Sequence, residues 1–221
     1  MNKEKKNYLL NEVSSQFIPF YHSLGFVFDR RIMEFKKNEQ IVLLEPEAEY
    51  EAKIIFAISL STQHEEIRLI KDKIFPEIPS SLTTYKLQEN VLDITRFGYK
   101  QFYKGWSISN SSDIIAMFKE HKLFMENCGF KFLTRFSNLN SIHENLNLKV
   151  LNNCNELKNT TKNELKGYIG EREILSGLIT AFLIDFDGIN RLIECYKNLY
   201  QSNNMNTLID KVSNYFKDEA R

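Results

Sequence analysis

The sequence has few cysteines, and no two of them are close together. Its 3 cysteines are Cys128, Cys154 and Cys195. An odd number without a Cys-x-x-Cys pair indicates neither a disulfide framework nor a zinc site. We therefore expect three buried thiols in a reducing compartment, and hence a cytoplasmic protein.

The chain also has no excess of charge of either sign and no long apolar run. Lys and Arg total 29, Asp and Glu total 29, and the formal net charge is +0. Binding to nucleic acid phosphates or to an anionic membrane surface requires clustered positive charge, so we expect neither partner. The longest apolar runs, residues 54–60 and 178–184, are too short to span a bilayer. The charged N-terminus is not followed by the apolar region of a secretory signal.

Aromatic and aliphatic residues are plentiful. Hydrophobic residues make up 43% of the chain, which contains 17 Phe and 10 Tyr. This is enough apolar material for a packed core, and it excludes global disorder. A length of 221 residues fits one large domain or two small ones.

The first half of the sequence predicts a helix followed by strands. Apolar residues recur at steps of three and four over residues 3–24, and Gly25 is placed to end that helix. Residues 26–35, 41–44 and 52–60 are rich in aromatic and β-branched residues, as strands are. Because their connections are short, an antiparallel meander is the expected arrangement.

A helix over residues 63–75 should follow this meander. Thr62 and Glu65 have the spacing of a capping box at its start. We interpret residues 85–97 and 99–108 as further strands of the same sheet.

The second half predicts helices. The cluster at residues 109–113 contains good N-cap residues for a helix that reaches Cys128 and is capped by Gly129. An irregular helix is expected near residues 139–151, and a strongly amphipathic helix over residues 165–183. Two more helices should follow, one capped by Asp187 and the last by Asn206 or Thr207.

Strands therefore precede helices along the chain, and this order indicates an α+β protein rather than a parallel α/β fold. We expect residues 1–108 to form an α+β sheet region and residues 109–221 a helical region. The helical region should pack on the sheet to give one compact unit.

Two short motifs suggest catalysis. Asp185-x-Asp187-Gly188 resembles the first motif of haloacid-dehalogenase-type phosphatases, in which the first Asp is the nucleophile. Glu51-Ala52-Lys53 resembles the metal-binding strand of PD-(D/E)xK nucleases. The residues around them favour an inter-helix turn for the first motif and a solvent-facing strand start for the second. No catalytic residue, metal ligand or cofactor is therefore predicted.

Two segments are candidates for a binding surface. Phe102, Tyr103 and Trp106 alternate with lysines, as in a stacking platform for single-stranded nucleic acid or in an ordinary edge strand, and we favour the strand. Trp106 is a candidate contact residue in either case. The second segment contains the sharpest local charge, at Glu45, Glu47, Glu49 and Glu51. It would attract a basic protein partner, or it is a solubilising loop.

Residues 24–31 (LGFVFDRR), 177–183 (GLITAFL) and 192–197 (LIECYK) are similar to segments of a group of uncharacterised bacterial α+β domains. Some domains of that kind sit beside secreted toxins, so the resemblance implies an immunity or adaptor role. We expect a non-catalytic protein-binding module of the immunity type. The alternative is an enzyme or small-molecule binder with a site in a crevice between the sheet and the C-terminal helices.

Overall fold

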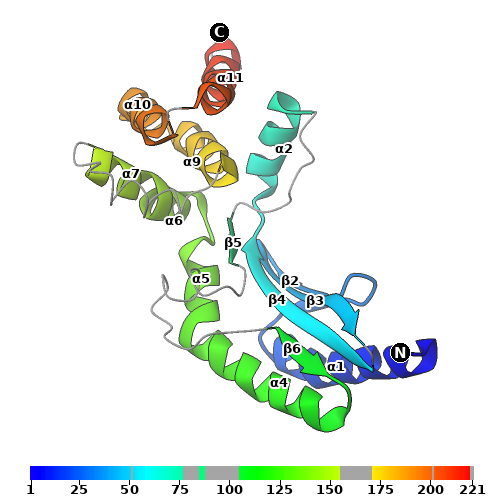
Figure 1. Ribbon diagram of the computed structural model, residues 1–221. Helices are drawn as coiled ribbons and strands as arrows, with labels where there is room; N and C mark the ends of the chain where they lie inside the picture. Colours follow the sequence, from blue (N-terminus) through cyan, green and yellow to red (C-terminus); the bar gives the residue numbers. More distant parts are fainter. Residues whose placement is uncertain (51, 77–84, 88–104, 155–170, 201, 220–221) are drawn as a thin grey trace. The chain divides into compact units, whose positions relative to one another are not determined.

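The structure is a computed structural model that describes residues 1–50, 52–76, 85–87, 105–154, 171–200 and 202–219. Figure 1 shows an N-terminal helix, α1 (Lys3–Ser23), an antiparallel sheet, and helices through the second half of the chain. This is the predicted α+β class, with strands preceding most of the helices.

The chain forms two compact units. Unit 1 consists of residues Met1–Thr62 and Lys86–Thr134, and unit 2 of Gln63–Tyr85 and Arg135–Arg221. The sequence-based boundary at residue 108 falls inside unit 1. Packing of residues 109–221 on the sheet as one unit stays a prediction.

The sheet is an antiparallel meander, as expected. Its first four strands pair in chain order, and a later strand pairs with the fourth. They are β1 (Val27–Asp29), β2 (Glu34–Lys37), β3 (Gln40–Tyr50), β4 (Lys53–Thr62) and β6 (Trp106–Ile108). β5 (Tyr85–Leu87) follows β4 in the strand order. The rest of the predicted strands 85–97 and 99–108 lies outside the described residues.

Two details of the meander differ from the prediction. Residues 26–35 form two strands, β1 and β2, joined by a turn, rather than one strand. The strand predicted to stop before Pro46 continues to Tyr50, because the β3–β4 register shifts between Pro46 and Ala48. Proline is tolerated at such irregularities, since its missing N–H interrupts no regular ladder there.

Helices α1 and α4 (Ser111–Phe124) lie side by side on one face of the sheet in unit 1 (Figure 1). The predicted apolar stripe of α1 is buried, and Gly25 ends the helix at a φ of 83°. Pro19 lies within α1, which begins at Lys3.

The helix after the β6 strand begins as predicted but ends later. Asn110 is its N-cap and accepts hydrogen bonds from the backbone N–H groups of Ser112 and Asp113. Gly129 is not a C-cap: it ends a π-helical turn, η1 (Met125–Gly129), that leads into α5 (Phe130–Arg135).

Unit 2 is helical. Its described helices are, in chain order, α2 (Glu65–Ile74), α6 (Leu139–Ile142), η2 (His143–Asn147), α7 (Leu148–Asn153), α9 (Glu171–Leu183), α10 (Ile189–Tyr200) and α11 (Asn203–Glu219). The irregular helix predicted near residues 139–151 is α6, the π-helical turn η2 and α7.

Two predicted helix starts in unit 2 are wrong. His64 is the N-cap of α2 and makes no side-chain capping bond, while Thr62 is the last residue of β4. α11 begins at Asn203, before the predicted caps Asn206 and Thr207. Strand pairing of Thr62 with Gln40 overrides the local capping pattern.

Candidate functional site

The acidic segment predicted as a binding surface lies on the second half of β3. Glu47 and Glu49 are exposed there, whereas Glu45 is half-buried and accepts a hydrogen bond of 2.5 Å from Ser59 Oγ. Glu51 lies outside the described residues. The three described glutamates therefore do not form one uniform acidic surface.

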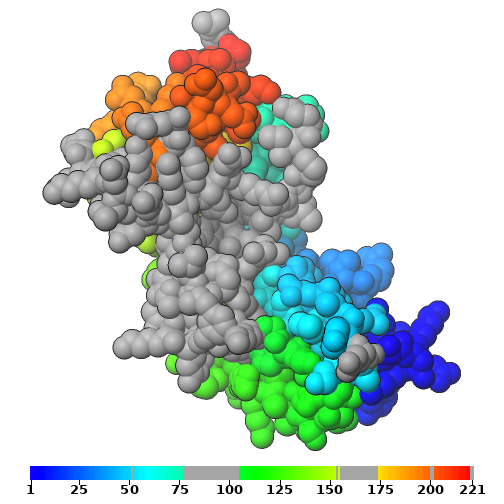
Figure 2. All heavy atoms as spheres, viewed as in Figure 1, coloured from blue at the N-terminus to red at the C-terminus, as the bar shows by residue number. Residues whose placement is uncertain are grey.

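Every residue from Pro46 to Tyr50 is exposed, and this stretch of β3 pairs with β4. The β2–β3 ladder ends at Leu43. Within the described residues, β3 beyond that point has a strand neighbour on one side and an open edge on the other. In Figure 2 the ends of β3 and β4, in light blue and cyan, lie at the surface near the N-terminal end of α1.

The start of α1 is tied to this edge by charge. Lys6 Nζ donates a hydrogen bond to Glu49 Oε1, and the resulting ion pair lowers the pKa of the Glu49 carboxyl. Glu47 makes no ion pair with any of the described residues. Its exposed carboxylate is thus a negative charge at the edge with no ion-pair partner among the described residues.

The predicted aromatic segment is only partly described. Trp106 is half-buried on β6, and its indole Nε1–H donates to Glu120 Oε2 at 2.9 Å. Phe102 and Tyr103 lie outside the described residues.

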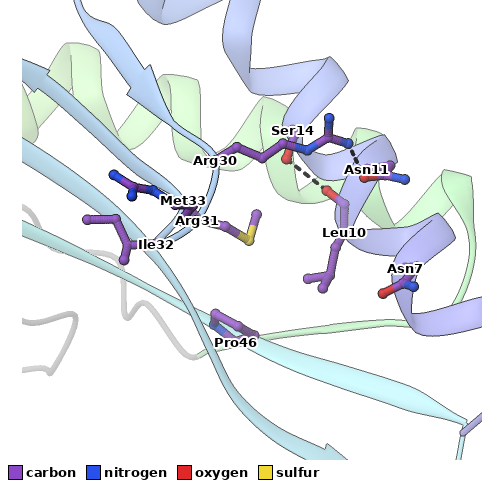
Figure 3. A pocket seen from close by; sticks show the side chains of 9 residues that line it. All are labelled: Asn7, Leu10, Asn11, Ser14, Arg30, Arg31, Ile32, Met33 and Pro46. Carbon is purple, nitrogen blue, oxygen red and sulfur yellow. Dashed lines mark hydrogen bonds between the residues drawn. The ribbon is translucent and has the colours of Figure 1, made fainter. Parts of the chain in front are cut away.

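A cavity of about 480 Å³ lies next to the open edge, between α1 and the β1–β2 turn (Figure 3). Its lining is Asn7, Leu10, Asn11, Ser14, Arg30, Arg31, Ile32, Met33 and Pro46. Sequence reasoning did not find it, because the polar side chains of α1 that line it have the spacing of an ordinary solvated helix face.

The two arginines of the cavity have different partners. Arg31 forms an ion pair of 3.0 Å with Asp29, and this hydrogen bonding lowers the pKa of the Asp29 carboxyl. Arg30 Nη2 instead donates to the neutral side chain of Asn11, at 2.5 Å from Oδ1. Arg30 therefore carries a charge with no ion-pair partner among the described residues.

The turn that carries these arginines has an unusual backbone. Met33 is buried and has a φ of 53°, a left-handed conformation that is uncommon for residues other than glycine. Its carbonyl accepts a hydrogen bond of 3.1 Å from the Leu44 N–H, which attaches the turn to β3.

Two of the buried histidines lie against a polar side chain. His121 Nε2 lies 2.5 Å from Tyr21 Oη in the core of unit 1, and burial lowers the pKa of His121 to about 3. In unit 2, His143 Nδ1 lies 2.9 Å from the Asn147 side-chain nitrogen. Burial also lowers the pKa of His143.

Asn147 organises a buried polar network in unit 2. Its amide nitrogen donates to the Gly177 carbonyl at 2.9 Å, and its Oδ1 accepts from the Tyr196 hydroxyl at 2.7 Å. The network joins η2 to α9 and α10. Because its groups satisfy one another inside the unit, we interpret it as structural rather than reactive.

The prediction that all three cysteines are buried thiols is wrong. Cys154 and Cys195 form a disulfide with a Cα–Cα distance of 5.4 Å, and Cys128 is buried and takes no part in it. The two bonded residues are 41 positions apart, so their spacing gave no sign of pairing. Because disulfides are rare in reducing compartments, the cysteines no longer indicate one.

The phosphatase-like motif lies in a turn of unit 2, and Glu51 of the nuclease-like motif lies outside the described residues. Asp185 and Asp187 lie in the turn between α9 and α10, which confirms the inter-helix interpretation. Across the described part of the chain, no group of three His, Cys, Asp or Glu side chains could hold a metal ion. No helix there is long and apolar enough to cross a membrane.

Comparisons with known proteins leave the family open. No protein-family model, no curated protein and no solved structure matches this chain.

Proposed function

We propose that the protein is a non-catalytic module that binds another protein through the open edge of β3 at Pro46–Tyr50. The observation that carries the proposal is the exposure of this entire stretch, with β4 as its strand neighbour on one side. An extended segment of a partner can join such an edge through main-chain hydrogen bonds.

The side chains of this edge restrict which partner can bind. Indiscriminate pairing with other sheet edges is hindered by Pro46, by the register shift next to it and by the charged glutamates. The exposed carboxylate of Glu47 favours a basic partner, and it raises the rate of encounter through electrostatic attraction. A toxin with a basic surface, as the resemblance to immunity-type domains implies, has this chemistry.

Affinity purification of the tagged protein from its native host tests the proposal. We expect one stoichiometric partner that is rich in basic residues. The variant Glu47→Gln/Glu49→Gln should recover at least about tenfold less of it, since close charge pairs at interfaces contribute roughly 1.5 kcal/mol or more.

The matched control is Asp218→Asn/Glu219→Gln, which removes two exposed carboxylates from the end of α11 in unit 2. It changes the net charge equally and should recover the partner normally. Equal recovery by both variants would show that the β3 edge is not the binding surface.

A further inference from the structure

The cavity between α1 and the β1–β2 turn has the composition of a site for a small anion. We propose that it binds a carboxylate group carried on a compact apolar body. The proposal does not depend on the partner proposed for the β3 edge.

The charge of the cavity is the first argument. Arg30 and Arg31 both line it, and none of the described residues that line it is acidic. Asp29 neutralises Arg31, whereas Arg30 is held by the neutral amide of Asn11. Among the described residues, one guanidinium at the cavity thus has no counter-charge, and guanidinium groups bind carboxylates with two parallel hydrogen bonds.

The arrangement of Arg30 is the second argument. Figure 3 shows its side chain reaching from the turn to Asn11 on α1. Because Asn11 Oδ1 accepts from Arg30, its amide N–H groups remain available as donors. Asn7 adds a second amide one helical turn earlier on the same face of α1. A carboxylate between them would meet donors from both the turn and the helix.

The remaining lining selects the rest of the ligand. Leu10, Ile32, Met33 and Pro46 supply apolar surface, which inorganic anions such as phosphate would leave unused. A volume of about 480 Å³ lies within the usual range of small-molecule sites. An organic acid with a short aliphatic body satisfies both the charged and the apolar parts.

The backbone of the turn supports a binding role independently. Met33 is held at a φ of 53° by burial and by the hydrogen bond from Leu44. Strained residues of this kind cluster at sites that must present groups in a fixed geometry. Fixing the turn fixes the point from which Arg30 extends.

A neighbouring hollow helps to locate the site. It has a volume of about 670 Å³, it shares Arg30, and its lining includes the carboxylates Asp29 and Glu34. These acids would repel an anion, and burial raises the pKa of Glu34, which shows that its charge is poorly solvated there. The anion site is therefore on the α1 side of Arg30.

The test is a titration of the full chain with N-acetyl-leucine, followed by the backbone NMR shifts of assigned residues. We expect saturable shifts at Asn7, Asn11 and residues 30–33, with half-saturation at roughly millimolar concentration, as is usual for a ligand this small. N-acetyl-leucinamide, which lacks only the negative charge, should give no such shifts.

Variants show whether Arg30 is responsible. Arg30→Gln should weaken binding by at least about tenfold, because a neutral amide cannot replace the charge-assisted hydrogen bonds of the guanidinium. Lys73→Gln, an exposed site on α2 in unit 2, changes the net charge equally and should bind as the wild type does. Binding of the amide as tight as that of the acid, unchanged binding by Arg30→Gln, or no shift up to roughly 50 mM would overturn the proposal.

A second ligand separates the two sources of such a carboxylate. The peptide Ala-Ala-Leu with a free C-terminus supplies the same group at the end of a polypeptide. Binding at least about tenfold tighter than that of N-acetyl-leucine assigns the site to a chain terminus, and equal binding assigns it to a free acid. Both outcomes support the carboxylate assignment.

Discussion

His121 shows how one buried residue can make stability depend on pH. Its pKa is lowered to about 3 in the folded protein, against about 6.5 in the unfolded chain. Between these values the unfolded state binds more protons than the folded state, so stability falls as the pH falls below 6.5. From pH 7 to pH 5 the free energy of unfolding should decrease by about 2 kcal/mol because of His121 alone.

Urea denaturation at several pH values measures this decrease. His121→Phe keeps the aromatic surroundings formed by Phe17 and Phe124 and removes the titrating group. The slope of its unfolding free energy against pH should be smaller than in the wild type, by the amount that corresponds to about one proton taken up on unfolding. His143 remains in the variant and, since its pKa is also lowered, accounts for part of the remaining slope. Identical slopes for both proteins would contradict the buried, neutral state of His121.

At the scale of elements, Gly177 allows three helical segments of unit 2 to approach closely. A Cβ at this position would lie 2.6 Å from Asn147 Oδ1 and 2.7 Å from Tyr196 Oη. Glycine inside an isolated helix costs about 1 kcal/mol relative to alanine. Here the collision should outweigh that gain, so Gly177→Ala is expected to destabilise the protein by about 1–3 kcal/mol in thermal or urea denaturation.

The background variant Asn147→Ala tests this explanation. With the asparagine amide removed, Gly177→Ala should cost less, because the two substitutions share one contact. If Gly177→Ala instead stabilises the protein by about 1 kcal/mol, as it would in an exposed helix, then η2, α9 and α10 do not approach closely at this point.

The disulfide between Cys154 and Cys195 connects the end of α7 to α10. It closes a loop with a sequence separation of 41, and such a cross-link stabilises a fold by about 4 kcal/mol in the chain-entropy model. Reduction should therefore lower the free energy of unfolding by an amount of that order.

Thiol titration of the denatured, unreduced protein provides the corresponding count. One reactive thiol, Cys128, is expected, and Cys128→Ala should leave none. Three reactive thiols in protein purified without reductant would restore the sequence-based interpretation of the cysteines.

At the scale of the whole molecule, local patterns predicted the class of the fold and most helices. The stripe of α1, the N-cap Asn110 and the positive φ of Gly25 follow from short-range rules, so they could be found from the sequence. The continuation of β3 past Pro46 depends on its pairing with β4, which no local pattern contains. The disulfide likewise depends on which helices pack together.

The candidate sites show the same limit. Glu47 and Glu49 could be proposed as binding residues from charge alone. The open strand edge on which they lie exists because the β2–β3 ladder ends early, at Leu43. The cavity lies between Asn11 on α1 and Arg30 on a turn 19 residues further along the chain. Neither side has a recognisable motif, because each becomes a site only when the two are brought together.

Hydrogen–deuterium exchange of β3, with and without the partner recovered by affinity purification, tests the central claim most directly. Backbone amides of residues 47–50 should exchange more slowly in the complex, because a partner strand would bond or cover them. The amides of α11, distant in sequence and part of unit 2, serve as the internal reference. Unchanged exchange at residues 47–50, with protection appearing elsewhere in the chain, would contradict the claim that the open edge of β3 is the binding surface.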